Sequence, residues 1–177
     1  MEPRYDRAAR ALHWLAGVLL LGQCAFGYWM DGIARNTPER AFFINLHKST
    51  GLLIGLLILL RIFWHLTRPT PRYPITLPRQ QQYLALGVHR VLYLLMLAMP
   101  VSGYLASNFS KYGVKFFNLV VLPPWGSDDK LIYGAFNQSH KIAAVLLLTL
   151  VALHVLAALW HAWLRDGIFS RISLRPF

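Results

Sequence analysis

Four long segments of the chain are apolar, and each is close to the length needed to cross a bilayer. They cover residues 11–30, 43–66, 84–107 and 140–164. About 20 residues of helix span the ~30 Å of hydrocarbon in a membrane. The first segment contains His13 and Trp14, which are atypical of a cleaved signal, so we expect it to be a retained span. The pattern predicts an all-α integral membrane four-helix bundle.

Two of the connecting segments have a distinct composition. Residues 67–83 include Pro69, Pro71, Pro74 and Pro78, which predicts an extended linker rather than a helix or a central strand. Residues 109–130 are aromatic and include lysines and Trp125. This composition predicts a short interfacial helix between spans three and four. No internal repeat is visible, so residues 1–177 are expected to form a single transmembrane domain.

Composition agrees with the membrane class. Charged residues make up 14% of the chain, against about 25% in soluble domains, and the mean hydropathy is +0.42. The net charge is +11, but the cations lie beside apolar segments and form no basic block, which favours interfacial anchoring over nucleic-acid binding. Cys24 is the single cysteine, which excludes an intramolecular disulfide and a cysteine-based metal site.

The charge distribution predicts an orientation. An even number of spans places both termini on one side of the membrane. The flanks 1–10, 67–90 and 165–177 hold ten arginines, whereas the opposite flanks, 31–48 and 108–141, hold seven cations. The positive-inside tendency therefore predicts cytoplasmic termini.

The histidines are concentrated within or at the ends of the spans. An ionisable residue inside a bilayer is rare and marks a candidate functional site. His154 lies among Leu, Val and Ala with no acid nearby, so its buried imidazole needs a partner, which a metal would provide. His65, His89 and His161 lie at span ends, and we interpret them as facing the lipid headgroups.

The spacing of two histidines in span four predicts two sites. His140 and His154 are fourteen residues apart, which is 40° short of four full turns, so they share a helix face about 21 Å apart. Such a distance excludes one shared iron and predicts two haems stacked across the membrane. By depth, His47 matches His140, whereas His13 matches His154 imperfectly and His161 competes with it. His65 is eighteen residues, or five whole turns, from His47 and faces the same side, so rival pairings stay open.

Small residues next to these histidines are compatible with a planar cofactor or with ordinary helix packing. They are Gly51, Gly55, Ala143, Ala144, Ala157 and Ala158. Pro100 is expected to kink span three.

Several motifs together resemble those of the bacterial cytochrome b561 family. They are Tyr5-Asp6, Leu12-His13-Trp14, Leu46-His47-Lys48-Ser49-Thr50-Gly51, Pro100-Val101-Ser102-Gly103-Tyr104, and Ser139-His140-Lys141 followed by His154. The resemblance covers nearly the whole chain. It implies a bacterial inner-membrane protein with two b-type haems, whose ligand pairs are His13 with His154 and His47 with His140.

The resemblance also implies an activity, namely electron transfer to or from ubiquinone. Some family members are superoxide oxidases acting at the outer face. All five lysines, with Arg35 and Arg40, fall on the predicted outer side, where they would attract an anion such as superoxide or bind lipid phosphates. Iron held by two histidines has no open position, so outer-sphere electron transfer is expected. The alternative is a haem-binding membrane anchor that relays electrons between quinone and a dehydrogenase or hydrogenase partner.

Overall fold

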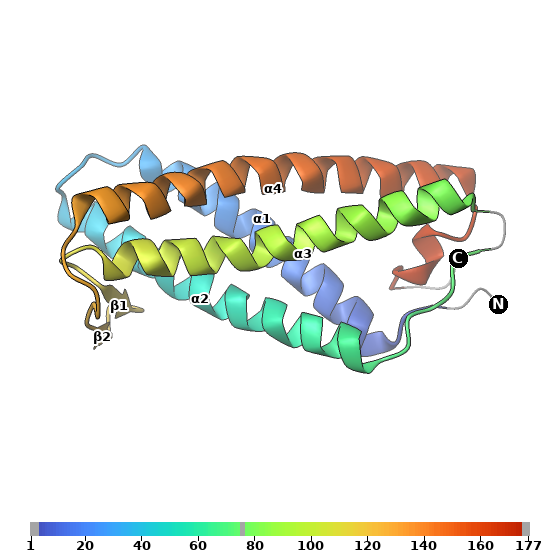
Figure 1. Cartoon of the computed structure of the whole chain (residues 1–177), viewed down its shortest axis with the longest axis horizontal. Coiled ribbons are helices and arrows are strands. Elements are labelled where there is room, and N and C mark those ends of the chain that lie inside the picture. The colour runs from blue at the N-terminus through green and yellow to red at the C-terminus, as the bar shows by residue number, and fades with distance from the viewer. Residues whose placement is uncertain (1–3, 75–76, 175–177) are drawn as a thin grey trace.

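The computed structural model describes residues 4–74 and 77–174, and four long helices form most of it (Figure 1). In chain order they are α1 (Arg7–Asp31), α2 (Pro38–Thr67), α3 (Arg79–Asn108) and α4 (Lys130–Leu164). Two short strands, β1 (Val114–Phe116) and β2 (Val120–Leu122), precede α4, and a 3₁₀ turn, η1 (Phe169–Arg171), follows it. The predicted all-α four-helix bundle is confirmed.

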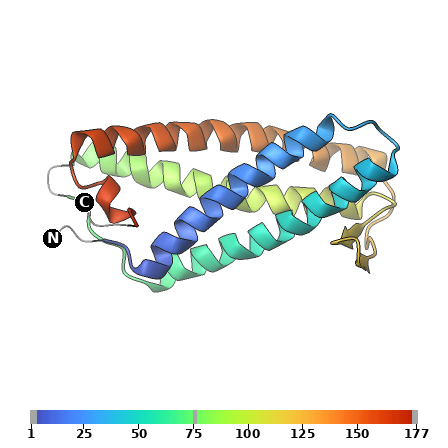
Figure 2. The ribbon, with the colours of Figure 1, turned by 180° about the vertical axis from the view of Figure 1, so that it is seen from behind.

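The helices alternate in direction, which gives the molecule two distinct ends. Both chain termini lie at one end, here called the termini end, and the two strands lie at the other, the hairpin end (Figure 1). α3 and α4 run side by side, while α1 crosses diagonally behind them, next to α2 at the termini end (Figures 1 and 2).

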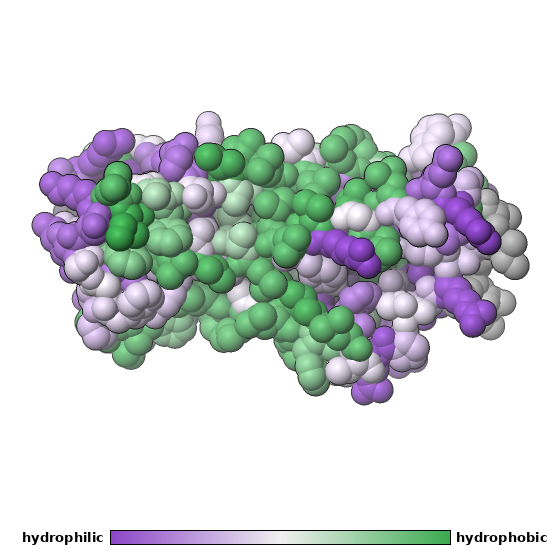
Figure 3. Space-filling model, viewed as in Figure 1, coloured by the Kyte–Doolittle hydropathy of each residue, from purple (hydrophilic) through white to green (hydrophobic). Residues whose placement is uncertain are grey.

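The outer surface of the bundle is suited to lipid. All four helices are long and apolar enough to cross a membrane, and few residues of their most apolar windows are buried within the protein. Hydrophobic side chains form a band around the middle of the visible face, and hydrophilic ones gather at the ends (Figure 3). Apolar side chains that face outward along a whole span require a hydrocarbon environment. The chain is therefore a multi-pass membrane protein.

The helices extend beyond the apolar segments at several ends. α4 begins ten residues before the predicted start at 140, where the Asp129 carboxylate accepts hydrogen bonds from the N–H groups of Leu131 and Ile132. α3 begins at Arg79, directly after the last proline of the linker, so only the proline-containing part is extended. Polar caps and helix-forming residues extend a helix outside the membrane, where hydropathy gives no signal.

The predicted interfacial helix between spans three and four is wrong. Within that segment, β1 and β2 pair as an antiparallel hairpin. Phe117 and Asn118 adopt positive φ values of 47° and 60°, as a type I′ turn requires. β-Branched Val114, Val120 and Val121 favour strand over helix.

Contacts with α2 hold the hairpin in place. The Phe117 N–H donates to Ser49 Oγ at 2.7 Å, and the Lys115 N–H donates to Asn45 Oδ1 at 3.3 Å. Lys48 Nζ donates to the Gly113 carbonyl at 2.8 Å. The hairpin thus packs against the start of α2 and covers that side of the bundle end.

An apolar layer crosses the middle of the bundle. It is formed by Leu20 of α1, Ile54 and Ile58 of α2, Leu92 and Met96 of α3, and Leu147 of α4. Leu147 is fully buried and lies seven residues from both His140 and His154. The layer therefore separates two histidine sites, one toward each end.

Candidate functional site

Two histidines face each other at the hairpin end. His47 lies nine residues after the start of α2 and His140 ten residues after the start of α4, so their depths match. Their ring centroids are 6.3 Å apart. Because a metal–imidazole nitrogen bond is about 2 Å long, two imidazoles on opposite sides of one metal have ring centres about 6 Å apart. The spacing of the pair fits a shared metal.

Hydrogen bonds orient the two histidines differently. His140 Nδ1 lies 2.9 Å from the Met99 carbonyl, so this nitrogen bears the proton and leaves Nε2 free to bind a metal. His47 Nδ1 is buried and makes no hydrogen bond, so the protein alone leaves a polar atom unsatisfied. Gln23 Nε2 donates to the His47 carbonyl at 2.7 Å and so fixes the backbone instead.

Glycines lie directly against both rings. A Cβ at Gly27 would lie 2.9 Å from His47 Cε1, and one at Gly103 would lie 3.3 Å from the His140 ring. Gly51 and Gly55, noted from the sequence, approach Gln23 and Pro100 instead, which is ordinary helix packing. The glycines that make room for the rings are therefore on α1 and α3.

A second cluster lies at the termini end. His154 of α4 has two histidine neighbours: His13 of α1, with ring centroids 6.2 Å apart, and His89 of α3, at 5.2 Å. His89 lies inside the bundle, and its Nδ1 is 2.6 Å from the Ala85 carbonyl, so the interpretation of His89 as a headgroup-facing residue is wrong. His154 therefore has two histidine neighbours, of which His13 lies at nearly the ring separation of the His47–His140 pair.

Arg61 of α2 completes this cluster, and it was not singled out from the sequence. Its Nη2 lies 2.8 Å from His13 Nδ1, and its guanidinium lies over the Tyr93 ring, 5.2 Å from the centroid. A guanidinium has only donors, so His13 Nδ1 accepts this bond. The sequence did contain a signal for this residue, because an arginine inside an apolar transmembrane run usually turns toward the protein interior.

The remaining histidines take other roles. His161 Nδ1 pairs with the Asp166 carboxylate at 2.5 Å, outside the bundle core. The exposed His65 ring stacks on Tyr93, with centroids 5.9 Å apart. Neither contacts His154 or His140 in the described residues, so the rival pairings that spacing had left open for His65 and His161 find no support.

The donor set fits a haem iron better than a bare ion. No group of three or more His, Cys, Asp or Glu side chains that could hold a metal ion occurs among residues 4–74 and 77–174. A porphyrin supplies four iron ligands itself, so two facing histidines complete the coordination.

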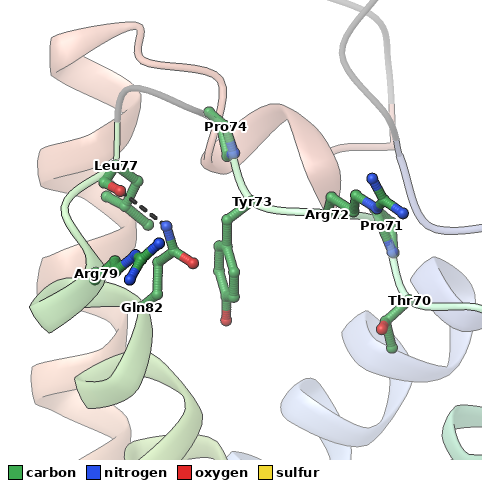
Figure 4. A pocket seen from close by; sticks show the side chains of 8 residues that line it. All are labelled: Thr70, Pro71, Arg72, Tyr73, Pro74, Leu77, Arg79 and Gln82. Atoms are coloured by element: carbon green, nitrogen blue, oxygen red, sulfur yellow. Dashed lines mark hydrogen bonds between the residues drawn. The ribbon is translucent and has the colours of Figure 1, made fainter.

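A cavity of about 570 Å³ opens at the termini end, in the linker before α3. Arg79 and Gln82 lie on one side, Arg72 on the other, and Tyr73 between them (Figure 4). Behind Tyr73, the guanidinium of buried Arg171 lies 4.3 Å from the ring centroid. These side chains offer hydrogen-bond donors to a ligand in the cavity.

Tyr5 connects this region with the histidine cluster. Burial raises the pKa of the Tyr5 hydroxyl, while nearby Arg171 and Arg61 oppose the shift. The ring of Tyr5 also lies under the Arg171 guanidinium, 5.5 Å away. Tyr5 therefore lies near the arginines of both regions, Arg171 beside the cavity and Arg61 in the histidine cluster.

Membrane-spanning helices with histidines that face each other across the bundle define a class, the b-type membrane cytochromes. The family model described as prokaryotic cytochrome b561 matches residues 4–173. The chain therefore belongs to the prokaryotic cytochrome b561 family, which confirms the resemblance noted in the sequence. Membership makes it a membrane electron-transfer protein and implies binding of haem b.

Individual relatives are similar at low identity but along almost their whole length. Cytochrome b561 homolog 2 of Escherichia coli (strain K12) is 28% identical over 96% of this chain and 90% of its own length. Cytochrome b562 of Cereibacter sphaeroides is 28% identical over 99% of this chain and 98% of its own length. A protein of Yersinia pestis named probable superoxide oxidase CybB is 27% identical over 97% of each chain.

Proposed function

We propose that this chain is a di-haem cytochrome that transfers electrons to or from ubiquinone. His47 and His140 bind one haem iron at the hairpin end, and His13 and His154 bind the other at the termini end. The observation that supports this most directly is the 6.2–6.3 Å separation of the ring centroids in both pairs. Two facing pairs, one on each side of an apolar layer, suit two stacked haems.

The chain's own residues orient the ligands and exclude water. Haem supplies an iron that changes its oxidation state by one electron. The Met99 carbonyl holds the proton of His140 on Nδ1 and thereby directs Nε2 to the iron. Leu147 and the other residues of the apolar layer keep water out between the two sites, so the electron crosses without proton leakage.

The termini-end cavity is the quinone position that we favour over the hairpin. Its volume of about 570 Å³ falls in the range typical of small-molecule sites. Arg79, Tyr73 and Gln82 can donate hydrogen bonds to a quinone carbonyl. Arg79→Gln is expected to raise the KM for quinone several-fold with unchanged haem spectra.

Superoxide is the donor that best suits the hairpin end. Each superoxide loses one electron to become O₂, and two such electrons with two protons reduce a quinone to quinol. Lys115, Lys130 and Arg35 have no ion-pair partner among the described residues, and they attract an anion to this end. The relative from Yersinia pestis named as a probable superoxide oxidase supports the same substrate.

Haem quantitation on histidine variants tests the ligand assignment. The wild type is expected to bind two haems, and His47→Ala, His140→Ala and His154→Ala one each. His65→Ala is the control, and it should retain both haems. A protein that binds no haem, or a His154→Ala variant with both haems and unchanged spectra, would contradict the proposal.

His13 and His89 compete as partners of His154, and the same assay separates them. Loss of a haem in His13→Ala, with retention in His89→Ala, supports the proposed pair. The reverse result assigns the iron to His89, whose Nδ1 proton is already held by the Ala85 carbonyl. Low-spin bis-histidine spectra in each variant show which iron loses a ligand.

We also propose that the termini end faces the cytoplasm, in the inner membrane of a bacterium. The arginines of the termini and of the linker support this orientation. Reporter fusions at residue 177 should be active only as cytoplasmic reporters, and fusions in the hairpin only as periplasmic ones.

A further inference from the structure

Arg61 is a cation placed inside a membrane span. It lies six residues before the end of α2, which is about 9 Å of helix from the end. Its side chain points into the bundle, where it contacts His13 and Tyr93. Charged residues at such depth are costly and are paired or line a functional site.

The described part of the chain offers Arg61 no carboxylate. Asp6 caps α1 and accepts from Trp64 Nε1, Asp31 pairs with Arg40 and Lys141, and Asp166 pairs with His161. Glu39, Asp128 and Asp129 belong to the hairpin end of the molecule. Within residues 4–74 and 77–174, therefore, no carboxylate balances the positive charge of Arg61.

Most of the hydrogen-bonding capacity of Arg61 is also free. A guanidinium has five N–H donors arranged to grip a carboxylate with two parallel bonds. One of the five meets a protein acceptor, His13 Nδ1, in the described structure. The Tyr93 ring face adds a cation–π contact but accepts no second hydrogen bond. The free donors belong to the same guanidinium that contacts His13, itself a neighbour of His154.

The present contact with His13 conflicts with metal binding by that residue. When Nδ1 accepts from Arg61, the single proton of neutral His13 is on Nε2. Binding of iron through Nε2 requires the proton on Nδ1, where Arg61 cannot donate. The guanidinium must then leave His13 and take another acceptor.

We propose that Arg61 is a carboxylate-binding residue inside the bundle and that it binds a propionate of the haem at the termini end. This inference rests on the proposed di-haem function. Haem b has two propionate carboxylates, which are the anionic groups that a haem brings to the protein. Binding would replace the Arg61–His13 contact with a charge-assisted pair and release His13 Nδ1.

Redox titration of the purified holoprotein tests the proposal. A nearby cation stabilises the extra electron of the reduced haem, so Arg61→Gln should shift the potential of one haem to more negative values and leave the other unchanged. Arg61→Lys retains the charge and should recover most of the shift. Arg68→Gln, at the C-cap of the same helix and exposed over Trp64, is the matched control and should shift neither haem potential.

Reconstitution with haem dimethyl ester isolates the carboxylate. If Arg61 binds a propionate, the ester and the Arg61→Gln substitution remove the same interaction, so their effects on haem affinity should not add. Additive losses of haem affinity, or equal potentials in Arg61→Gln and the wild type, overturn the proposal.

The outcomes separate this inference from the function on which it rests. A wild type without haem refutes the di-haem proposal itself. A wild type with two haems and an Arg61→Gln variant with unaltered potentials refutes only the role of Arg61. If Arg61→Gln loses haem and Arg61→Lys retains it, the positive charge at this position is what binds the haem, which supports the proposal. If both variants lose haem, Arg61 has a structural role instead, and the proposal is overturned.

Discussion

At Gly27 the missing Cβ allows the His47 ring to lie against α1. A methyl group on this residue would lie only 2.9 Å from His47 Cε1, closer than carbon atoms normally approach. Gly22, five residues earlier in the same helix, has open space at the same position. The two glycines therefore differ in environment while sharing a helical backbone.

Gly27→Ala is expected to displace His47 and to reduce haem content from about two per chain toward one. Gly22→Ala is the control. This variant should bind the wild-type amount of haem, because a Cβ at Gly22 meets open space and alanine favours the helix by about 1 kcal/mol over glycine. Haem quantitation of the purified proteins measures both. Equal haem in the two variants would show that the ring adapts to the methyl group.

Asp6 joins two helix ends at the termini end. Its carboxylate accepts from the Ala9 N–H at 2.8 Å and from Trp64 Nε1 at 3.0 Å. The Ala9 N–H foremost, with help from Trp64, lowers the pKa of Asp6 below its ordinary value of 3.8. The ionised form is therefore the one that the fold prefers.

A pH dependence follows for the wild type. A lowered folded-state pKa contributes stability above the ordinary value, and this contribution is lost as the pH falls from 3.8 through the lower pKa of the folded state. Asp6→Ala should lower Tm by about 2–4 °C at pH 7, the scale of one lost N-cap. Below pH 3 the Tm difference should shrink. A constant difference in thermal scans in detergent would contradict this role.

The helices were predictable from sequence, whereas the hairpin was not. Long apolar runs predict membrane-spanning helices directly, since a helix satisfies its own backbone hydrogen bonds in hydrocarbon. Phe117 and Asn118 lie outside the bilayer, where a turn and contacts with Ser49 and Asn45 decide the local structure. Aromatic content alone could not distinguish an interfacial helix from a strand.

The candidate site was predictable only in part, for a similar reason. Helical periodicity placed His140 and His154 on one face of α4. It could not reveal His89 or Arg61 as their neighbours, because the rotation of α3 and α2 about their own axes is a property of packing. A histidine near a span end has the same sequence signal whether it faces lipid or the core.

Ser49 is a buried link between the hairpin and α2. Its hydroxyl is fully buried and accepts from the Phe117 N–H at 2.7 Å. Ser49→Ala leaves that N–H unpaired, at a cost of about 1–3 kcal/mol. Faster amide exchange across residues 114–122 is expected. Thr149→Ala, which removes a hydroxyl bonded only within its own helix, should leave that exchange unchanged.

At the scale of the whole molecule, charge is distributed unequally between the ends. At the hairpin end Asp31 bridges Arg40 and Lys141, at 3.0 and 3.3 Å, and joins α1, α2 and α4. Asp31 and Lys141 are both more than half exposed, so these ion pairs contribute about 0–1 kcal/mol to stability. The larger effect of Asp31 is on the field that an approaching anion meets.

Asp31→Asn should therefore accelerate haem reduction by superoxide several-fold at low salt and steepen its dependence on ionic strength, with little change in Tm. Asp166→Asn removes a carboxylate at the opposite end and should leave the rate unaltered. Stopped-flow spectroscopy measures both rates. An unchanged rate in Asp31→Asn would argue against electrostatic attraction of the donor.

The central place of α4 has a consequence for biogenesis. In the proposed arrangement this last helix provides one ligand to each iron, and the C-terminal turn after it is held by N-terminal donors such as Arg10 and Trp14 across 163 and 158 residues of chain. A ribosome-bound chain that has inserted only its first three helices holds neither complete pair. Complete binding of either haem must therefore await insertion of α4, so cofactor loading follows the synthesis of all four helices.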